Sequence, residues 1–158
     1  MNTLNKELKG KAVDLGLCTE WTEKWTEKTK DELCRMYILG IDFCIKHSYP
    51  NNDYMKKNFE GVMQKHGIHV SEEIHDKNVR IAVYNGKCKG SASFDNFSVG
   101  RIYLRHDSDL IVKASGYSKV FISTYDNTKL KVECSENAKV YVYRKGGIVE
   151  YSGNVRIR

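Results

Sequence analysis

The residues best suited to chemistry in this 158-residue chain are cations and aromatic rings that alternate along its second half. Guanidinium and ammonium groups neutralise anions, and neighbouring rings offer a surface on which bases or apolar side chains can stack. This combination predicts a basic-aromatic binding face on a β-structure. Its candidate binding residues are Arg101, Tyr103, Arg105, Lys119, Phe121, Lys139, Tyr141 and Tyr143.

Histidines provide two weaker candidates for chemistry. His66 and His69 are three residues apart, as in some metal pairs, but no carboxylate or cysteine stands at a ligand spacing and Gly67 separates them. His106 precedes Asp107 in a turn, where a histidine can act as a general base but more often forms a solvated corner. We therefore expect no catalytic residue, no metal and no cofactor.

Charge divides the chain into two halves. Residues 1–76 have 11 Lys and Arg against 13 Asp and Glu, or −2, whereas residues 77–158 have 15 against 7, or +8. The two values sum to the net charge of +6. The hydrophobic period changes at the same place, from near 3.6 residues to near 2. We expect an α+β protein with a helical head over 1–76 and a β-region over 77–158.

The head is expected to contain about three helices. An apolar stripe runs from Leu4 to Leu15 and ends at Gly16. Thr29 and Glu32 have the spacing of a capping box, so a long, mostly buried helix begins there and ends before Pro50. Asn51 and Asn52 offer an N-cap for a third helix, which ends at Gly67.

The β-region repeats about every ten residues. Apolar pairs two residues apart begin at 110, 120, 130 and 140, with small residues at fixed offsets and turn-forming residues between them. Such regular spacing is typical of a stacked repeat, in which each strand buries its inward face against the next coil. We interpret the region as a short right-handed β-solenoid that the head packs against and caps. An ordinary β-sandwich also has strands every eight to twelve residues and is the alternative.

The outward residues alternate in character between successive strands, which favours two strands per coil. That arrangement predicts one ladder of Tyr103, Phe121 and Tyr141, and a second ladder of Arg101, Lys119 and Lys139 beside it. A triangular coil of three strands is the main variant, and it would break up both ladders.

The repeats resemble those of bactofilin-like and adhesin-like β-solenoid domains. The similarity lies in the segment 137–143, read with 128–132 and 118–122. With the segment 40–45, it extends to uncharacterised proteins of gut Bacteroidales and their phages that join a small helical head to a short β-solenoid. The resemblance implies this fold and an origin in a phage or mobile element. It implies no catalytic residues.

These observations favour a non-enzymatic structural or protein-interaction module that presents the basic-aromatic face. The alternative is that the face, or a junction between subunits, binds an anionic ligand such as nucleic acid or a small nucleotide. We expect a homo-oligomer, either a dimer or a trimer, with another protein as a further partner and no membrane. Five widely spaced cysteines and a charged N-terminal segment without an apolar run suggest reduced thiols and a cytoplasmic location.

Overall fold

The computed structural model describes residues 1–158, which divide into two compact units. Met1–His66 is helical and Gly67–Arg158 is a β-solenoid, so the expected α+β class with a solenoid is confirmed. The chain divides after His66, ten positions before the expected boundary at 76. The difference arises because the first two strands lie in a segment that is still acidic. The expectation that the head caps the solenoid stays a prediction.

The helical unit contains five α-helices rather than about three. The expected long helix is divided at Gly40, because glycine in a helix interior has a high conformational entropy cost. None of these helices is long and apolar enough to cross a bilayer. The elements are α1 Thr3–Asp14, α2 Thr19–Lys24, α3 Lys30–Leu39, α4 Ile41–His47, α5 Asn52–Phe59 and a short 3-10 helix Met63–His66.

Both predicted helix starts are confirmed. The hydroxyl of Thr29 accepts from the amide of Glu32 at 3.1 Å, while the Glu32 carboxylate accepts from the Thr29 amide at 3.0 Å. The side chain of Asn51 accepts from the amide of Tyr54 at 2.8 Å. Each contact satisfies an amide that the first helical turn leaves without a partner.

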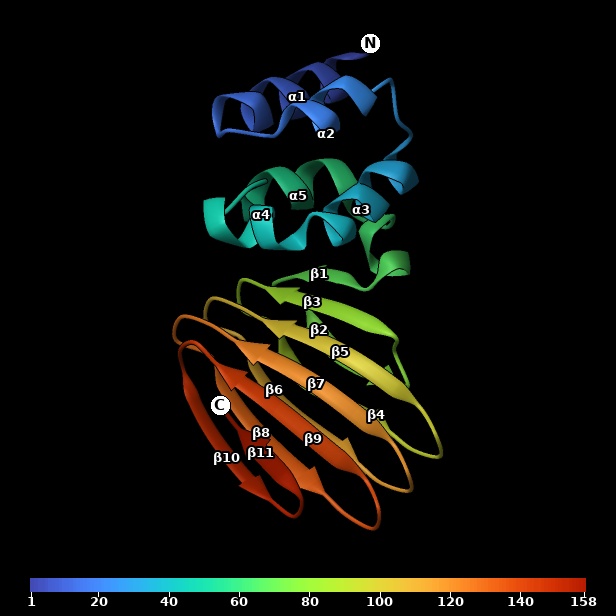
Figure 1. Ribbon diagram of the computed structural model, residues 1–158, viewed down its shortest axis with the longest axis vertical. Helices are drawn as coiled ribbons and strands as arrows, with labels where there is room; N and C mark the ends of the chain where they lie inside the picture. The colour runs from blue at the N-terminus through green and yellow to red at the C-terminus, as the bar shows by residue number, and fades with distance from the viewer. The chain divides into compact units, whose positions relative to one another are not determined.

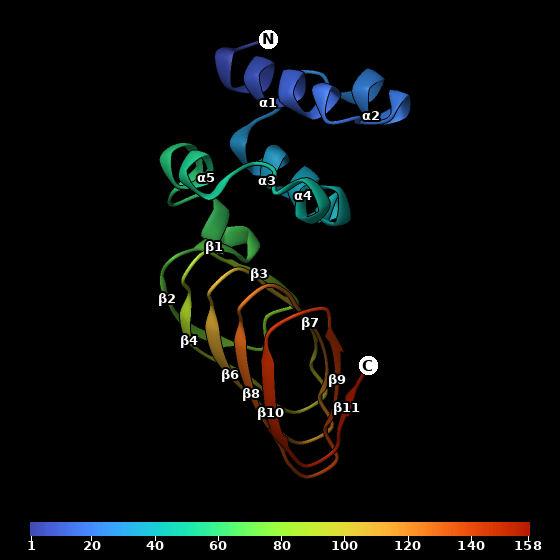
Figure 2. The same cartoon turned by 90° about the vertical axis from the view of Figure 1, so that its left-hand side faces the viewer.

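The solenoid consists of eleven strands that alternate between two sheets (Figure 1). Sheet A has the order β1-β3-β5-β7-β9-β11, and sheet B has the order β10-β8-β6-β4-β2. Figure 2 shows the resulting coils, each made of one strand from sheet A and one strand from sheet B. The strands are β1 Ile68–Val70, β2 Glu73–Lys77, β3 Ile81–Asn85, β4 Lys89–Phe94, β5 Val99–Leu104, β6 Asp109–Ala114, β7 Lys119–Thr124, β8 Lys129–Cys134, β9 Lys139–Arg144, β10 Ile148–Ser152 and β11 Val155–Ile157.

The regular coil spans twenty positions of the chain. Val120 pairs with Val140 in sheet A, and Leu110 pairs with Leu130 in sheet B. Paired residues in successive coils are therefore twenty positions apart in the sequence. All strand pairs are parallel, which excludes the antiparallel sandwich and any series of hairpins. Because only two sheets exist, the triangular coil is excluded and two strands per coil are confirmed.

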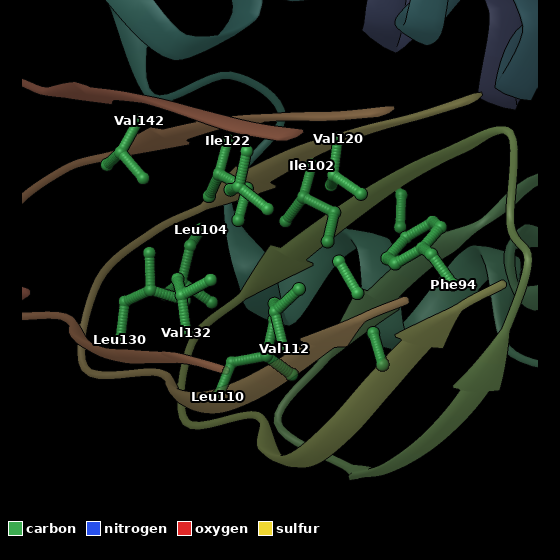
Figure 3. Packing of buried hydrophobic residues seen from close by; sticks show 14 of the residues in the cluster. Phe94, Ile102, Leu104, Leu110, Val112, Val120, Ile122, Leu130, Val132 and Val142 are labelled. Carbon is green, nitrogen blue, oxygen red and sulfur yellow. The ribbon is translucent and has the colours of Figure 1, made fainter. Parts of the chain in front are cut away.

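Inward side chains form apolar rows that run through successive coils. Ile102, Ile122 and Val142 share one row of sheet A, and Val112 and Val132 share a row of sheet B. Figure 3 shows these two rows packed against each other across a narrow core. All five side chains are at most 1% exposed, and burial of each stabilises the fold by about 1.5–3 kcal/mol.

At one place in the core, a large residue in one sheet faces a small residue in the other. Phe94 from β4 is buried, whereas Ala114 occupies its row in the next coil. Opposite the ring, Gly100 occupies the row that Val120 and Val140 fill in later coils. A Cβ atom at Gly100 would lie 2.2 Å from the Phe94 ring, so the glycine makes room for the phenyl group.

The corners between strands share one backbone design. Each contains a residue with positive φ and ends in a small residue that is half-buried or buried. One example is Ser118, whose amide donates to the carbonyl oxygen of Ser115 at 3.3 Å. Positive φ recurs at every tenth position, so both corners of the coil turn in the same way. The positions are Asn96, His106, Gly116, Asp126 and Glu136.

Val120→Asp should unfold the solenoid unit, because it places a carboxylate without a partner in an apolar core. The expected loss is about 3 kcal/mol or more. Ile111→Asp in β6 is the matched control, since Ile111 points outward and is 37% exposed. Circular dichroism melts should show lost β-structure for the first variant and a near-native curve for the second. A native melt for V120D would contradict the inward placement.

Gly100→Val should destabilise the solenoid by about 1–3 kcal/mol, because the new methyl groups overlap the Phe94 ring. Urea unfolding of this variant should be compared with that of Phe94→Ala and of the double variant. The double variant should be more stable than the sum of the single losses predicts, because each change vacates space that the other fills. Strict additivity would show that the two residues do not share a site.

Candidate binding face on sheet A

The strands of sheet A lie side by side across the coils (Figure 1). Their register places the outward side chains of successive strands in rows. The middle row contains Arg101, Phe121, Tyr141 and Arg156, contributed in order by β5, β7, β9 and β11. Neighbouring strands are about 4.8 Å apart, so these four side chains follow one another closely. We define the basic-aromatic face as Arg101, Lys119, Phe121, Lys139, Tyr141, Tyr143 and Arg156.

The predicted aromatic ladder is wrong at one position. It placed Tyr103 beside Phe121, whereas the hydrogen-bonded register pairs Tyr103 with Ser123, two positions further along β7. Tyr103 therefore lies in the row of Ser123 and Tyr143, and Arg101 takes its expected place beside Phe121.

The predicted cation ladder is displaced for the same reason. Lys119 and Lys139 are paired and exposed, as expected. Their neighbour in β5 is Val99 rather than Arg101. Both lysines lie two residues before a ring of the middle row, which corresponds to about 6.6 Å along the strand. The lysines therefore flank the rings instead of continuing the arginine.

Phe121 and Tyr141 form the centre of the face. Their ring centroids are 5.3 Å apart with an interplanar angle of 14°, and both side chains are half-buried. Each ring covers one side of the other, so the stack holds both in place while leaving their edges accessible. Tyr143, in the adjacent row, is also half-buried. The face thus offers an apolar centre with cations on several sides.

Two predicted site residues do not lie on the exposed face. Tyr103 is only 7% exposed, and its hydroxyl accepts from Nε of Arg101 at 2.8 Å, with the guanidinium 5.4 Å from the ring centroid. Arg105 is 4% exposed and donates to Oδ1 of Asn85 at 2.7 Å, while its Nε has no partner. Tyr103 therefore positions Arg101, and Arg105 is part of the interior of the fold.

Charge is distributed very differently on the two sheets. The strands of sheet A contain five Lys and Arg and no Asp or Glu, whereas those of sheet B contain five of each sign. In sheet B the signs alternate along one row from Glu73 through Lys89 and Asp109 to Lys129. The charges of the sheet B strands therefore cancel, whereas the strands of sheet A carry five positive charges and no negative one.

A small hollow of about 30 Å³ lies at the C-terminal end of the face and is lined by Lys139, Val140, Tyr141, Asn154 and Arg156. This volume corresponds to about one water molecule, well below the several hundred Å³ of a typical ligand pocket. This hollow is therefore too small to enclose a substrate.

His106 belongs to a ladder of corner hydrogen bonds. Its Nδ1 accepts from the amide of Gly86 at 2.9 Å, and its own amide donates to Oδ2 of Asp126 at 2.9 Å. At the opposite corner, Oε1 of Glu136 accepts from the amide of Gly116 at 3.3 Å. In each pair a side chain at a positive-φ position binds the equivalent amide of the preceding coil. The Nδ1 atom of His106 is therefore occupied by a structural contact.

The two other candidate histidines lie in different units. Nε2 of His66 is 2.7 Å from Oδ1 of Asp31 in the helical unit. His69 contacts Glu72, and its Nε2 lies 3.7 Å from Asp76 in the solenoid. No group of three or more His, Cys, Asp or Glu side chains meets in a way that could hold a metal ion.

The cysteines do not form disulfides, and four of the five are buried. Burial is the main cause that raises the pKa of Cys34 to about 11, and it raises the pKa of Cys88 and Cys134 as well. These three thiols are therefore protonated at neutral pH, which makes them poor nucleophiles. Cys44 is buried as well.

Sequence reasoning missed a second aromatic stack at a corner. Phe97 and Tyr117 have centroids 5.1 Å apart at 10°, and they are 78% and 60% exposed. Val99, at 59% exposure, adjoins them at the start of β5. The signal was present, because the two rings are one full coil apart in sequence. Both rings lie at a corner, outside the strand positions at which the sequence predicted ladders.

Comparison of the chain with models of protein families, with curated proteins and with solved structures finds no match. The β-solenoid is identified by the strand pairing itself. A functional proposal for this chain is therefore built on the geometry and charge of the basic-aromatic face.

The solenoid should lose stability as the pH falls below about 6.5, the usual histidine value. Burial is the main cause that lowers the pKa of His106, and the positive charge of Arg105 lowers it further. The negative charges of Asp126 and Asp107 act in the opposite direction but do not reverse the shift. The unfolded chain therefore binds this proton at a higher pH than the folded chain does. The contribution of neutral His106 to the free energy of unfolding is therefore fully present above about pH 6.5. It is lost as the pH falls towards the lowered pKa of the folded state.

Urea unfolding between pH 7.5 and 5.5 tests this dependence. His106→Asn is the variant to compare, because asparagine tolerates positive φ and its Oδ1 can accept from the Gly86 amide, yet it does not titrate. The variant should show a smaller drop in unfolding free energy over this range. An unchanged drop would assign the dependence to other groups.

Proposed function

We propose that this chain is a non-enzymatic protein-interaction module whose basic-aromatic face binds an acidic protein surface. The stacked pair Phe121–Tyr141, surrounded by cations on a sheet without carboxylates, carries the proposal. Protein interfaces are enriched in aromatic residues and arginine at their centre and place charged groups at a solvated rim. The face has this composition, with Arg101 and Arg156 in line with the rings and two lysines beside them.

The backbone supports binding by fixing the face in advance. β5, β7 and β9 are each hydrogen-bonded on both sides, and stacking holds the two central rings. A face that is ordered before contact loses little conformational entropy when a partner binds. The parallel stack therefore favours a recognition role over a catalytic one. The structural contacts of His106 support the same conclusion, since they occupy the nitrogen that a general base would use.

The charge pattern supports an acidic partner. Sheet A has an excess of five cations over its strands, whereas the charges of sheet B cancel. An anionic surface would be attracted to sheet A from a distance and would then meet the apolar stack at short range. Free cysteines are typical of reducing compartments, so we place the interaction in the cytoplasm. An origin in a phage or mobile element remains part of the proposal through the resemblance of the repeats.

Site-specific photo-crosslinking tests the proposal. A photoreactive phenylalanine analogue at Phe121 should capture a discrete partner from a lysate of the organism that encodes the chain. The same analogue at Ile111, an exposed residue of sheet B, is the matched control. The adduct should form at 121 but not at 111. When the irradiation is carried out at about 0.3 M salt, the yield at 121 should fall only in part, because screening weakens the ionic contacts but leaves the apolar ones.

The triple variant Arg101→Ser, Lys119→Ser, Lys139→Ser should fold normally and lose the adduct. Equal capture from both positions, or capture that does not depend on the three cations, would contradict the proposal. Circular dichroism of the triple variant supplies the control for folding.

A second candidate function is binding of an anionic ligand such as single-stranded nucleic acid. The absence of carboxylates from all strands of sheet A favours it. A fluorescent oligothymidylate would then bind with a slope of about −3 in log K against log salt, as expected for four phosphate contacts. Protein binding that survives salt, with no oligothymidylate binding at low salt, would exclude this candidate.

A further inference from the structure

We propose that the acidic partner of this chain binds sheet A as one extended segment whose side chains follow the order apolar, acidic, apolar. This contact rests on the proposed function, to which it adds the chemistry of the partner. The first apolar side chain contacts the corner patch, which we define as Phe97, Val99 and Tyr117. The acidic side chain contacts the two lysines of the basic-aromatic face, and the second apolar side chain contacts its central ring stack.

The corner patch is a second apolar surface beside the basic-aromatic face. Its two rings are stacked, and all three of its side chains are exposed. Val99 connects the patch to the face, because it pairs with Lys119 in the register of β5 and β7. Exposed apolar side chains that gather in one place mark an interaction site, whereas single ones are usual on any surface. The patch is therefore an anchor for a partner that already covers the face.

The backbone of the corner holds the two rings of the patch in position. The amide of Tyr117 donates to the carbonyl oxygen of Asn96 at 2.8 Å, so a hydrogen bond joins the two coils beside the rings. A Cβ atom at Gly116 would lie 2.9 Å from the nitrogen of Asn96, and the glycine permits this close approach. The stack is thus ordered before contact, and it loses little conformational entropy when a partner binds.

Two carboxylates lie at the same corner, and both have partners within the protein. Oδ1 of Asp95 accepts from Nδ2 of Asn78 at 2.8 Å, and its Oδ2 lies 3.4 Å from Nζ of Lys77. Oε1 of Glu136 accepts from the amide of Gly116 at 3.3 Å. These internal contacts direct both carboxylates towards groups of the corner itself.

The lysines of the face lie between its ring stack and the corner patch. Lys119 follows Tyr117 by two residues and precedes Phe121 by two, and the residues between them are buried. Neither Lys119 nor Lys139 takes part in an ion pair within the protein. A partner that covers both apolar sites must remove water from these ammonium groups, which is costly unless it supplies an opposite charge there. The middle group of the partner is therefore acidic.

An extended segment matches the spacing of these three sites. Side chains on one side of a strand are two residues and about 6.6 Å apart, which is also the step from Lys119 to Phe121 along β7. A segment that runs along β7 therefore places alternate side chains on the patch, the lysines and the ring stack. The side chains between these positions point away from sheet A. The recognised pattern thus has an acidic residue with an apolar residue two positions before it and another two positions after it.

Titration of the full chain with a short peptide, followed through the NMR shifts of its amides, tests this pattern. The peptide has phenylalanine, glutamate and phenylalanine at alternate positions, with serine between them. It should bind with a Kd of about 1 mM or tighter and shift the amides of 97–99, 117–121 and 139–141. A permuted peptide of the same composition, with glutamate next to the first phenylalanine, should bind at least about fivefold more weakly, because its carboxylate points away from the lysines.

Variants of the chain test each site separately. Tyr117→Ser should weaken binding of the alternating peptide by about fivefold or more, whereas Ile111→Ser on sheet B should not change it. Replacing Lys119 and Lys139 together by Met should weaken binding of the glutamate peptide but not of a peptide with glutamine in its place, since only the first pairs with the ammonium groups. Circular dichroism of each variant verifies its folding.

Equal binding of the alternating and permuted peptides, or binding that does not depend on Tyr117, would overturn the extended segment as the occupant. The same holds if the alternating peptide shifts no amide. Tighter binding of oligothymidylate than of the peptide, at the same salt and the same amides, would assign this surface to nucleic acid instead. In each case photo-crosslinking at Phe121 still decides the proposed function on its own, because that experiment requires neither the corner patch nor the peptide.

Discussion

The parallel hydrogen-bond register between coils determines the rest of the solenoid. Each coil must align its amides and carbonyls with those of the preceding coil, and this requirement fixes the length of the regular coil at twenty positions. The register in turn decides which residues share a row. It places valines and isoleucines in the core, brings Phe121 onto Tyr141, and stacks positive-φ corner residues whose side chains bind across coils. A change of register would move every one of these contacts.

The two sheets use the same backbone for different surfaces. Opposite charges in register neutralise sheet B, so that surface is stable in water without a partner. Sheet A combines cations with a half-buried aromatic stack, and we propose that an acidic surface covers it. We propose that function on this fold depends on the extended outer surface of sheet A.

Sequence periodicity predicted the solenoid, its inward rows and its two strands per coil, because burial imposes the same residue class at each equivalent position. It did not predict the row of Tyr103. That tyrosine follows the inward Ile102, whereas Phe121 follows Val120, so similar residues occupy different positions of the coil. The burial of Arg105 depends on contacts distant in sequence, which spacing does not reveal. Gly40 similarly divided a helix that the apolar pattern had presented as continuous.

Disulfide formation between engineered cysteines tests the length of the regular coil most directly. In a Cys18→Ser background, which removes the one exposed native thiol, cysteines at 121 and 141 occupy adjacent strands about 4.8 Å apart. This separation permits a disulfide, whereas cysteines at 103 and 121 would be about 8 Å apart and could not form one. Mass spectrometry after mild oxidation should therefore find the 121–141 bridge alone. A 103–121 bridge without a 121–141 bridge would contradict the register.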